Sequence, residues 1–190
     1  METLYLHAVV FEESVGVPAS IAQMPNLRFL YLDVQRGGVK NVKFFEALKV
    51  KVPRLRVKFH LVTKPELKEL DALGRFLLTQ TQFENLDLYA ASVRPETLHA
   101  VKRAVLAMPK LKVFYFYFAG QTGLSNKDLV EFSEVYPKMP QLEIMSFDCQ
   151  QKPLVNEEVK GMFDQFKLIK RMRSFKFKAN FRNIDEKAFG

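Results

Sequence analysis

The chain has 190 residues, of which 48% are hydrophobic and 26% are charged, and its formal net charge is +8. This length suits one domain with a buried core, and the composition is that of a folded protein rather than a disordered one. No apolar run approaches the roughly 20 residues that a membrane-spanning helix needs, and the first residues lack the basic region of a secretory signal. The single cysteine, Cys149, excludes an internal disulfide and suits a reducing compartment, so we expect a cytoplasmic protein.

A short apolar pattern recurs along the chain every 26 to 31 residues. Each copy has an apolar residue, two variable residues, and then two apolar residues separated by one variable residue. Side chains alternate across a strand, so the last two apolar residues of a copy share one face and each copy predicts a β-strand. The copies are Met1-Leu4-Leu6, Leu27-Leu30-Leu32, Phe83-Leu86-Leu88, Leu111-Phe114-Phe116, Leu142-Met145-Phe147 and Met172-Phe175-Phe177.

A seventh strand is predicted between the second and third of these copies, where the pattern is irregular. Val57 and Phe59 supply the apolar pair, Arg54 occupies the first apolar position, and Leu55 lies one place late. We expect a deleted residue or a local bulge at this point. Seven units then fill the chain without a spacer, which predicts a single domain over residues 1–190.

The segments between the strands have apolar residues three and four places apart, which is the spacing of one face of a helix. Three segments show it most clearly: Leu98-Val101-Val105-Met108, Leu129-Phe132-Tyr136-Met139 and Val159-Met162-Phe166-Ile169. Such a stripe needs a neighbouring element to cover it, so we expect these helices to pack against the strands.

Capping residues and prolines mark the ends of the predicted helices. Two polar pairs can cap helix starts and two prolines suit first turns: Thr63 with Glu66, Ser125 with Asp128, Pro65 and Pro95. Proline cannot extend a helix, and it biases the preceding residue towards extended geometry. Four tetrapeptides therefore predict the step from a helix to the next strand: Met24-Pro-Asn-Leu27, Met108-Pro-Lys-Leu111, Met139-Pro-Gln-Leu142 and the variant Val52-Pro-Arg-Leu55.

Strands that alternate with helices form right-handed crossover units, and consecutive units of this kind stack into one parallel sheet. Because strands about 4.8 Å apart pack more closely than helices, such a sheet must curve. We predict an α/β horseshoe arc of about seven strand–helix repeats, with a concave parallel sheet and convex helices. The repeat length and the LxxLxL core resemble the leucine-rich repeat family, specifically its long-repeat, ribonuclease-inhibitor-like class, in degenerate form over about residues 1–180.

In such an arc, the residues between and beside the core leucines lie on the concave face. Several are tyrosines, which are enriched at binding hot spots because they bury a large area at a small entropy cost. We expect a partner-binding surface formed by Tyr5, Phe29, Tyr31, Lys58, His60, Asp87, Tyr89, Tyr115 and Tyr117. The alternative is an aromatic ladder that only stabilises cross-strand pairs.

Two stretches of the chain are strongly basic. Between Lys40 and Lys58, seven basic residues stand against Glu46 alone. The second stretch has no acidic residue and contains Lys167, Lys170, Arg171, Arg173, Lys176, Lys178 and Arg182. Such runs are either solvated faces or docking surfaces for an acidic protein, a phosphate-bearing ligand or RNA.

The residues that could carry catalysis are dispersed. His7 and His60 fall in one predicted row but two strands apart, roughly 10 Å, which is too far for them to share a metal ion. His99 has no partner at metal-ligand spacing, and Cys149 has no nearby histidine to lower its pKa. We therefore expect no enzyme activity, no cofactor and no metal site.

The sequence favours a non-catalytic scaffold that binds a protein partner, with an acidic partner as one option, through the tyrosine-bearing concave face. The alternative is RNA binding by residues 167–182, with base stacking on Phe175, Phe177 or Phe181. We expect no membrane contact.

Solenoids normally shield their first and last units with polar caps. Here the apolar pattern begins at Met1, and only a short segment follows the last copy. We expect Leu4 and Leu6 to be exposed at one end, and Phe175, Phe177 or Phe181 at the other. The chain is then predicted to work within a larger assembly, to pair end to end, or to be part of a longer protein.

Overall fold

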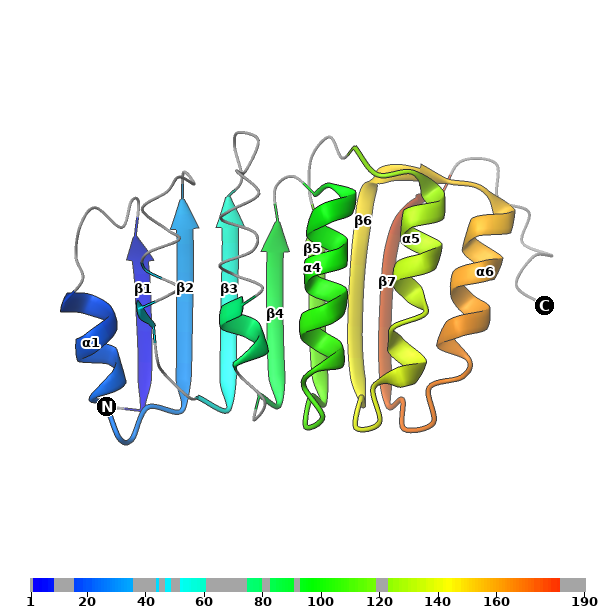
Figure 1. Cartoon of the computed structure of the whole chain (residues 1–190). Helices are drawn as coiled ribbons and strands as arrows, with labels where there is room; N and C mark the ends of the chain where they lie inside the picture. The colour runs from blue at the N-terminus through cyan, green and yellow to red at the C-terminus, as the bar shows by residue number, and fades with distance from the viewer. Residues whose placement is uncertain are drawn as a thin grey trace.

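The computed structural model describes residues 2–8, 16–35, 44, 47–48, 52–60, 75–79, 83–90, 93–118 and 123–181. Within them, seven strands form one open sheet, all neighbours are parallel, and the spatial order follows the chain from β1 to β7. Figure 1 shows the strands side by side and the labelled helices on one side of the sheet. The predicted α/β class, with a parallel sheet built from strand–helix units, is therefore confirmed.

The elements follow the predicted alternation. The strands are β1 (Thr3–Ala8), β2 (Phe29–Gln35), β3 (Arg54–His60), β4 (Asn85–Ala90), β5 (Val113–Phe118), β6 (Ile144–Leu154) and β7 (Ser174–Phe181). The helices are α1 (Gly16–Ala22), α4 (Pro95–Leu106), α5 (Asn126–Ser133), the 3₁₀ turn η1 (Tyr136–Lys138) and α6 (Asn156–Phe166). Residues 75–78 also form a helical turn ahead of β4.

The apolar rows of the sheet face the helices. Cα partners on neighbouring strands align the apolar pair of each repeat with the pair of the next, from Leu4 and Leu6 on β1 to Phe175 and Phe177 on β7. Members of both rows on the inner strands, such as Leu30 and Phe116, are fully buried in a core that continues through the described repeats. Each repeat therefore completes its hydrophobic interior with its neighbours.

The register of β3 differs from our prediction. Leu55, rather than Val57, aligns with Leu30 of β2, and Val57 aligns with Leu32. Val52 is fully buried and takes the first apolar position. The predicted deletion or bulge is therefore wrong, because β3 begins as a regular copy of the pattern. The sequence was ambiguous because β3 carries three alternating apolar residues, and a shift by two residues leaves the same face buried.

An irregularity does occur, but between β6 and β7. Cys149 pairs with Ala179, whereas the next paired residue of β6 is Pro153, which pairs with Asn180. The residues between Cys149 and Pro153 therefore form a bulge in β6, a device that bends a strand locally.

The helix stripes are buried as predicted. Each of the twelve stripe residues on and after α4, α5 and α6 is buried, among them Leu98, Phe132 and Met162. At the start of α5, the Ser125 hydroxyl accepts from the Asp128 N–H at 3.2 Å, and the Asp128 carboxylate accepts from the Ser125 N–H at 2.6 Å. This confirms the predicted capping box. Pro95 opens α4, and the Thr63 and Pro65 positions lie outside the described residues.

The three methionine–proline turns share one hydrogen bond. In Met24–Leu27, Met108–Leu111 and Met139–Leu142, the leucine N–H donates to the methionine carbonyl oxygen at 3.2 Å. The bond therefore gives the three connections from helix to strand the same turn. Leu55 aligns with Leu30, so Val52, three residues earlier and buried, is the counterpart of Leu27 and not of these methionines, contrary to our prediction.

A second set of backbone bonds joins the start of each strand to the strand before it. The carbonyl oxygen of Glu84 accepts from the N–H groups of both Lys112 and Val113, at 2.8 and 2.9 Å. The same double acceptance recurs at the carbonyls of Glu2, Pro53, Lys112 and Glu143. We call the edge that carries these residues and the loops before the strands (23–28, 107–112, 139–143 and 167–173) the strand-start edge.

The helices are spread more widely than the strands in Figure 1. A sheet with closely spaced strands and outer helices curves in this way, so the arrangement is compatible with a solenoid-like arc.

Candidate functional site

The candidate site is the face of the sheet that points away from the helices, which we call the open face. No described helix lies on it (Figure 1). Its residues form three rows across β1 to β7: Thr3, Phe29, Arg54, Asn85, Val113, Ile144 and Ser174; Tyr5, Tyr31, Arg56, Asp87, Tyr115, Ser146 and Lys176; His7, Asp33, Lys58, Tyr89, Tyr117, Asp148 and Lys178.

The corrected register changes which residues of β3 belong to the centre of this face. Arg56, which we had not assigned to the site, lies beside Asp87, the place we had predicted for Lys58. Lys58 moves into the row of Tyr89, and His60 moves one step beyond the three rows. The side chains of Lys58 and His60 are outside the described part of the chain. Val52 could have revealed the correct register from the sequence, because it stands three residues before Leu55, as Leu27 stands before Leu30. With this register, Arg56 falls in the central row of the open face.

An aromatic group occupies the β1–β2 end of the open face. The Tyr5 ring lies 5.6 Å from the Phe29 ring and 5.7 Å from the Tyr31 ring, measured between centroids. Tyr5 is 60% exposed, whereas Tyr31 is 9% exposed because its neighbours cover it. This group therefore offers one accessible ring that is held in place by two less accessible ones.

A second aromatic pair lies on β5. The rings of Tyr115 and Tyr117 are 6.2 Å apart, and both side chains are half-buried, as is Tyr89 on β4. Burial raises the pKa of Tyr117. The Tyr117 hydroxyl therefore stays protonated at neutral pH and can act as a hydrogen-bond donor.

Charged residues separate the two aromatic groups. The Nε atom of Arg56 lies 2.9 Å from Oδ2 of Asp87, and the Arg56 guanidinium lies 5.5 Å from the centre of the Tyr31 ring. The other carboxylate oxygen of Asp87, Oδ1, is buried without a hydrogen-bond partner among the described residues. Burial raises the pKa of Asp87, and the lowering by Arg56 is the smaller influence. Arg56 is thus fixed between an aromatic ring and a carboxylate that has lost much of its hydration.

The second basic stretch does not form one surface. Lys167, Lys170, Arg171 and Arg173 lie on or next to the loop between α6 and β7, at the strand-start edge. Lys176 and Lys178 lie on the open face of β7, where Lys178 is 3.7 Å from Asp148. Arg182 lies outside the described residues. Alternation along β7 therefore divides the contiguous basic run between two surfaces.

The predicted terminal residues are half-buried. Leu4 and Leu6 on β1, and Phe175 and Phe177 on β7, are partly buried and pack against the core. The rings of Phe166 and Phe175, for example, are 4.8 Å apart. The side chain of Phe181 is not described. The ends of the described array thus retain some accessible apolar surface, but not fully exposed rings.

The remaining reactive groups do not form a cluster. The described residues hold no group of three or more His, Cys, Asp or Glu side chains placed to bind a metal ion. Cys149 is fully buried, and burial raises the pKa of its thiol to about 12, so the thiol is protonated at neutral pH. On the helix side, His99 lies beside a groove between α4 and α5 that encloses about 10 Å³, room for about one water molecule.

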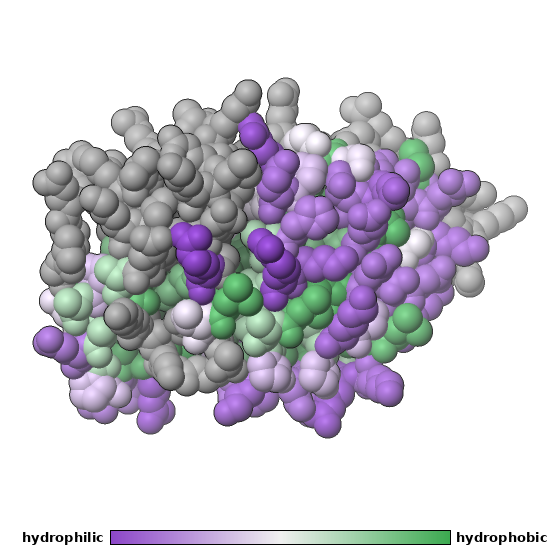
Figure 2. All heavy atoms as spheres, viewed as in Figure 1, coloured by the Kyte–Doolittle hydropathy of each residue, from purple (hydrophilic) through white to green (hydrophobic). Residues whose placement is uncertain are grey.

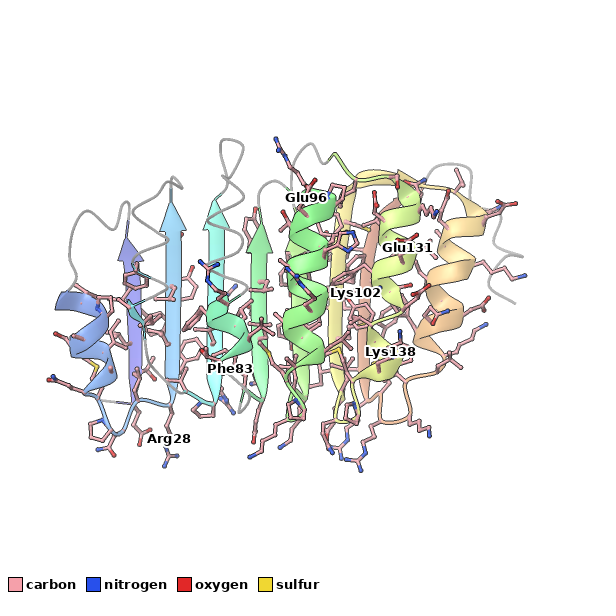
Figure 3. The ribbon with its side chains drawn as sticks, in the orientation of Figure 1. Arg28, Phe83, Glu96, Lys102, Glu131 and Lys138 are labelled. Atoms are coloured by element: carbon pink, nitrogen blue, oxygen red, sulfur yellow. The ribbon has the colours of Figure 1, made fainter. Side chains whose placement is uncertain are left out.

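The polar groups at this groove join the helices. Figure 3 shows Lys102 of α4 and Glu131 of α5 near each other, and the Lys102 Nζ donates to the Glu131 backbone carbonyl oxygen at 3.1 Å. The helix side over α4 to α6 is largely hydrophilic (Figure 2). No described helix combines the length and the apolar character that crossing a membrane requires.

Comparison with known proteins gives no assignment. No protein-family model matches the chain, and no curated protein matches it.

Proposed function

We propose that this chain is a non-catalytic interaction scaffold of the leucine-rich-repeat type, which binds a protein partner through the open face. The observation that carries the proposal is a parallel sheet face that bears aromatic side chains and on which no described helix lies. Parallel sheets in globular proteins usually have both faces covered, so an uncovered aromatic face needs an explanation.

The distribution of the aromatic residues supports a binding role. Tyr5 on β1 and Tyr115 with Tyr117 on β5 provide two apolar contact areas, and each tyrosine carries a hydroxyl at its tip. Rings of this kind bury a large area on binding while losing little conformational freedom. Two separated aromatic areas also suit an extended partner that lies across several strands.

The charges of the open face favour an acidic partner. Among the described side chains, its three rows hold four basic residues, Arg54, Arg56, Lys176 and Lys178, against three acidic ones, Asp33, Asp87 and Asp148. The excess is small and lies beside the aromatic areas, so it would orient a partner more than it would add affinity. We place the protein in a reducing compartment such as the cytoplasm, since Cys149 is a free thiol.

The aromatic ladder without a partner is the competing explanation. The low exposure of Tyr31 supports this explanation, because its neighbours cover the ring almost completely. The high exposure of Tyr5 speaks against it, because most of this side chain remains in water. RNA binding by residues 167–182 has less support, since the cations of that run lie on two surfaces and Phe175 and Phe177 are half-buried in the core.

The test is quantitative affinity capture from the native source with three proteins. The open-face variant is Tyr5→Ser/Tyr115→Ser, and the matched control is Val155→Ser/His99→Ser, which changes two exposed residues outside the open face. We expect the wild type and the control to retain the same partner, and the open-face variant to bind it at least about tenfold more weakly, as loss of hot-spot residues does. Equal capture by all three proteins would show that the open face is not the binding surface.

A further inference from the structure

A different surface, the strand-start edge, carries the inference. All seven strands are parallel, so the loops that lead from a helix into a strand meet at one edge of the molecule. Arg28, which is labelled at this edge in Figure 3, and the side chains of the neighbouring loops project away from the sheet. Residues about 30 positions apart in the sequence become neighbours there.

One set of cations at this edge is neutralised within the protein. Lys112 lies 3.3 Å from Glu84, and Arg173 lies 3.4 Å from Glu143. Each of these four residues immediately precedes one of the strands β4 to β7, so acidic and basic side chains alternate along the starts of the strands. This inner row offers little net charge to a ligand.

A second set lies further out and has no carboxylate partner among the described residues. It consists of Lys110, Lys138, Lys170 and Arg171, all exposed, which we call the basic edge. The Arg171 guanidinium donates to the side-chain oxygen of Gln141 at 2.6 Å, a bond to a neutral group that leaves its charge uncompensated. Proximity to a helix C-terminus can explain a lysine such as Lys138, but Arg171 lies five residues beyond the end of its helix.

Exposed leucines accompany these cations. Leu106 is 43% exposed at the last residue of α4, and Leu168 is 58% exposed between α6 and β7. Leu78, 43% exposed, ends the helical turn ahead of β4. Three of the five large hydrophobic residues with high exposure in the described chain thus lie at the helix ends next to this edge.

We propose, in place of our expectation from the sequence that the protein makes no membrane contact, that the strand-start edge docks onto an anionic lipid surface. Phosphate and carboxylate groups of the lipids would pair with the basic edge, and Leu106 and Leu168 would enter the headgroup region, the combination found in peripheral membrane contacts. Such a contact needs no spanning helix. It also leaves the open face free, so that membrane docking and partner binding can occur together.

The apolar residues decide between a lipid surface and a nucleic acid. A phosphodiester backbone would use the cations but would leave the leucines in water. Nucleic-acid surfaces that bind single strands add aromatic rings for base stacking, and the only aromatic residue with high exposure in the described chain is Tyr5, on the open face. A row of loop tips with apolar side chains between cations fits a flat lipid surface better.

The test is co-sedimentation of the intact chain with vesicles of phosphatidylcholine alone and with about 30% phosphatidylserine. We expect binding to the anionic vesicles only, and weaker binding as the salt concentration rises from about 0.1 M to about 0.5 M. Each cation near an anionic surface contributes roughly fivefold in affinity. The variant Lys138→Gln/Lys170→Gln should therefore bind about 25-fold more weakly.

The matched control is Lys127→Gln/Lys160→Gln, which removes the same charge from exposed positions near the start of α5 and on α6. It should bind like the wild type. Leu168→Ser should weaken binding severalfold without changing the salt dependence. Absence of binding to the anionic vesicles, or an equal loss in both charge variants, would overturn the proposal. So would a tighter complex with a single-stranded RNA oligonucleotide that only the Lys138→Gln/Lys170→Gln variant weakens.

Discussion

The molecule contains two groups of aromatic residues with similar ring spacing and different surroundings. In the core, the Phe116 ring lies 5.4 Å from Phe132 and 6.0 Å from Phe147. On the open face, the Tyr5 ring lies 5.6 Å from Phe29 and 5.7 Å from Tyr31. The difference is burial, since Phe116 is fully buried and Tyr5 is mostly exposed. Ring spacing alone does not distinguish a packing cluster from a binding surface, whereas the face of the sheet does.

The residue types follow this division. The core group uses phenylalanine, which buries no polar atom, and the open face uses mainly tyrosine, whose hydroxyl can remain hydrated. Tyr136 is the exception, because it is fully buried in the core and its hydroxyl has no hydrogen-bond partner among the described residues. Substitutions in the two groups should therefore have different consequences.

The largest effect is expected for Phe116→Ala. This change removes a buried ring from the centre of the core and should lower the free energy of unfolding by about 3–5 kcal/mol. Tyr115→Ala, one residue earlier and on the other face, is the control and should cost much less. Urea unfolding of both variants measures the difference. Similar losses would mean that the open-face tyrosines are part of the packing.

Tyr136→Phe should have the opposite sign. It removes the buried, unpartnered hydroxyl while keeping the ring, so we expect the free energy of unfolding to rise by about 1 kcal/mol. Phe132→Leu, in the adjacent ring, controls for general tolerance of the core and should destabilise. A loss of stability in Tyr136→Phe would reveal a hydrogen bond to this hydroxyl.

A smaller, pH-dependent effect is expected for Asp87→Asn on the open face. Because burial raises the pKa of Asp87, the folded state holds the proton to a higher pH than the unfolded state. The stabilisation from this group is complete below the unfolded pKa and is lost as the pH rises through the folded pKa. The variant lacks that loss, so its stability relative to the wild type should be higher at about pH 7 than at about pH 4.

Urea unfolding at the two pH values measures this change, and Asp148→Asn, for which Lys178 is the neighbour, is the comparison. A relative stability that falls with rising pH would mean that the Arg56 ion pair outweighs burial.

The smallest effect on stability is expected for Tyr5→Ser. The ring is mostly in water, so the free energy of unfolding should change by less than about 0.5 kcal/mol. Thermal unfolding measures it, with Tyr31→Ser as the covered neighbour that should cost more. A large loss in Tyr5→Ser would favour the aromatic ladder over the binding surface.

Alternation and helical spacing were sufficient to predict the rows of the sheet and the buried stripes of the helices. The register of β3 was not predictable from spacing alone, because its alternating apolar residues satisfy two registers. The deciding residue was Val52, whose proline neighbour made it resemble the end of a helix. In the structure Val52 lies two residues before β3 and is fully buried, so it takes the first apolar position of the pattern.

The surfaces were predicted less completely than the core. Tyr31 and Ser146 on the open face have low exposure because side chains of neighbouring strands cover them. The residue pattern of one strand does not show what its neighbours will cover. The basic edge was missed because Lys110, Lys138 and Lys170 come before three different strands and are about 30 residues apart in the sequence. A run of adjacent cations, such as residues 167–182, attracts notice in a sequence, although alternation divides it in space.

The double acceptance at the strand starts affects how the array tolerates changes in length. Successive core leucines or their equivalents, from Leu30 through Leu55 to Leu86, are 25 and 31 residues apart. The methionine–proline turns before β2, β5 and β6 and the paired N–H groups fix the geometry where these strands begin. Insertions engineered at the opposite rim, after the strands end, should leave the stacking of the repeats unchanged, whereas one added residue in a methionine–proline turn should misalign every later strand.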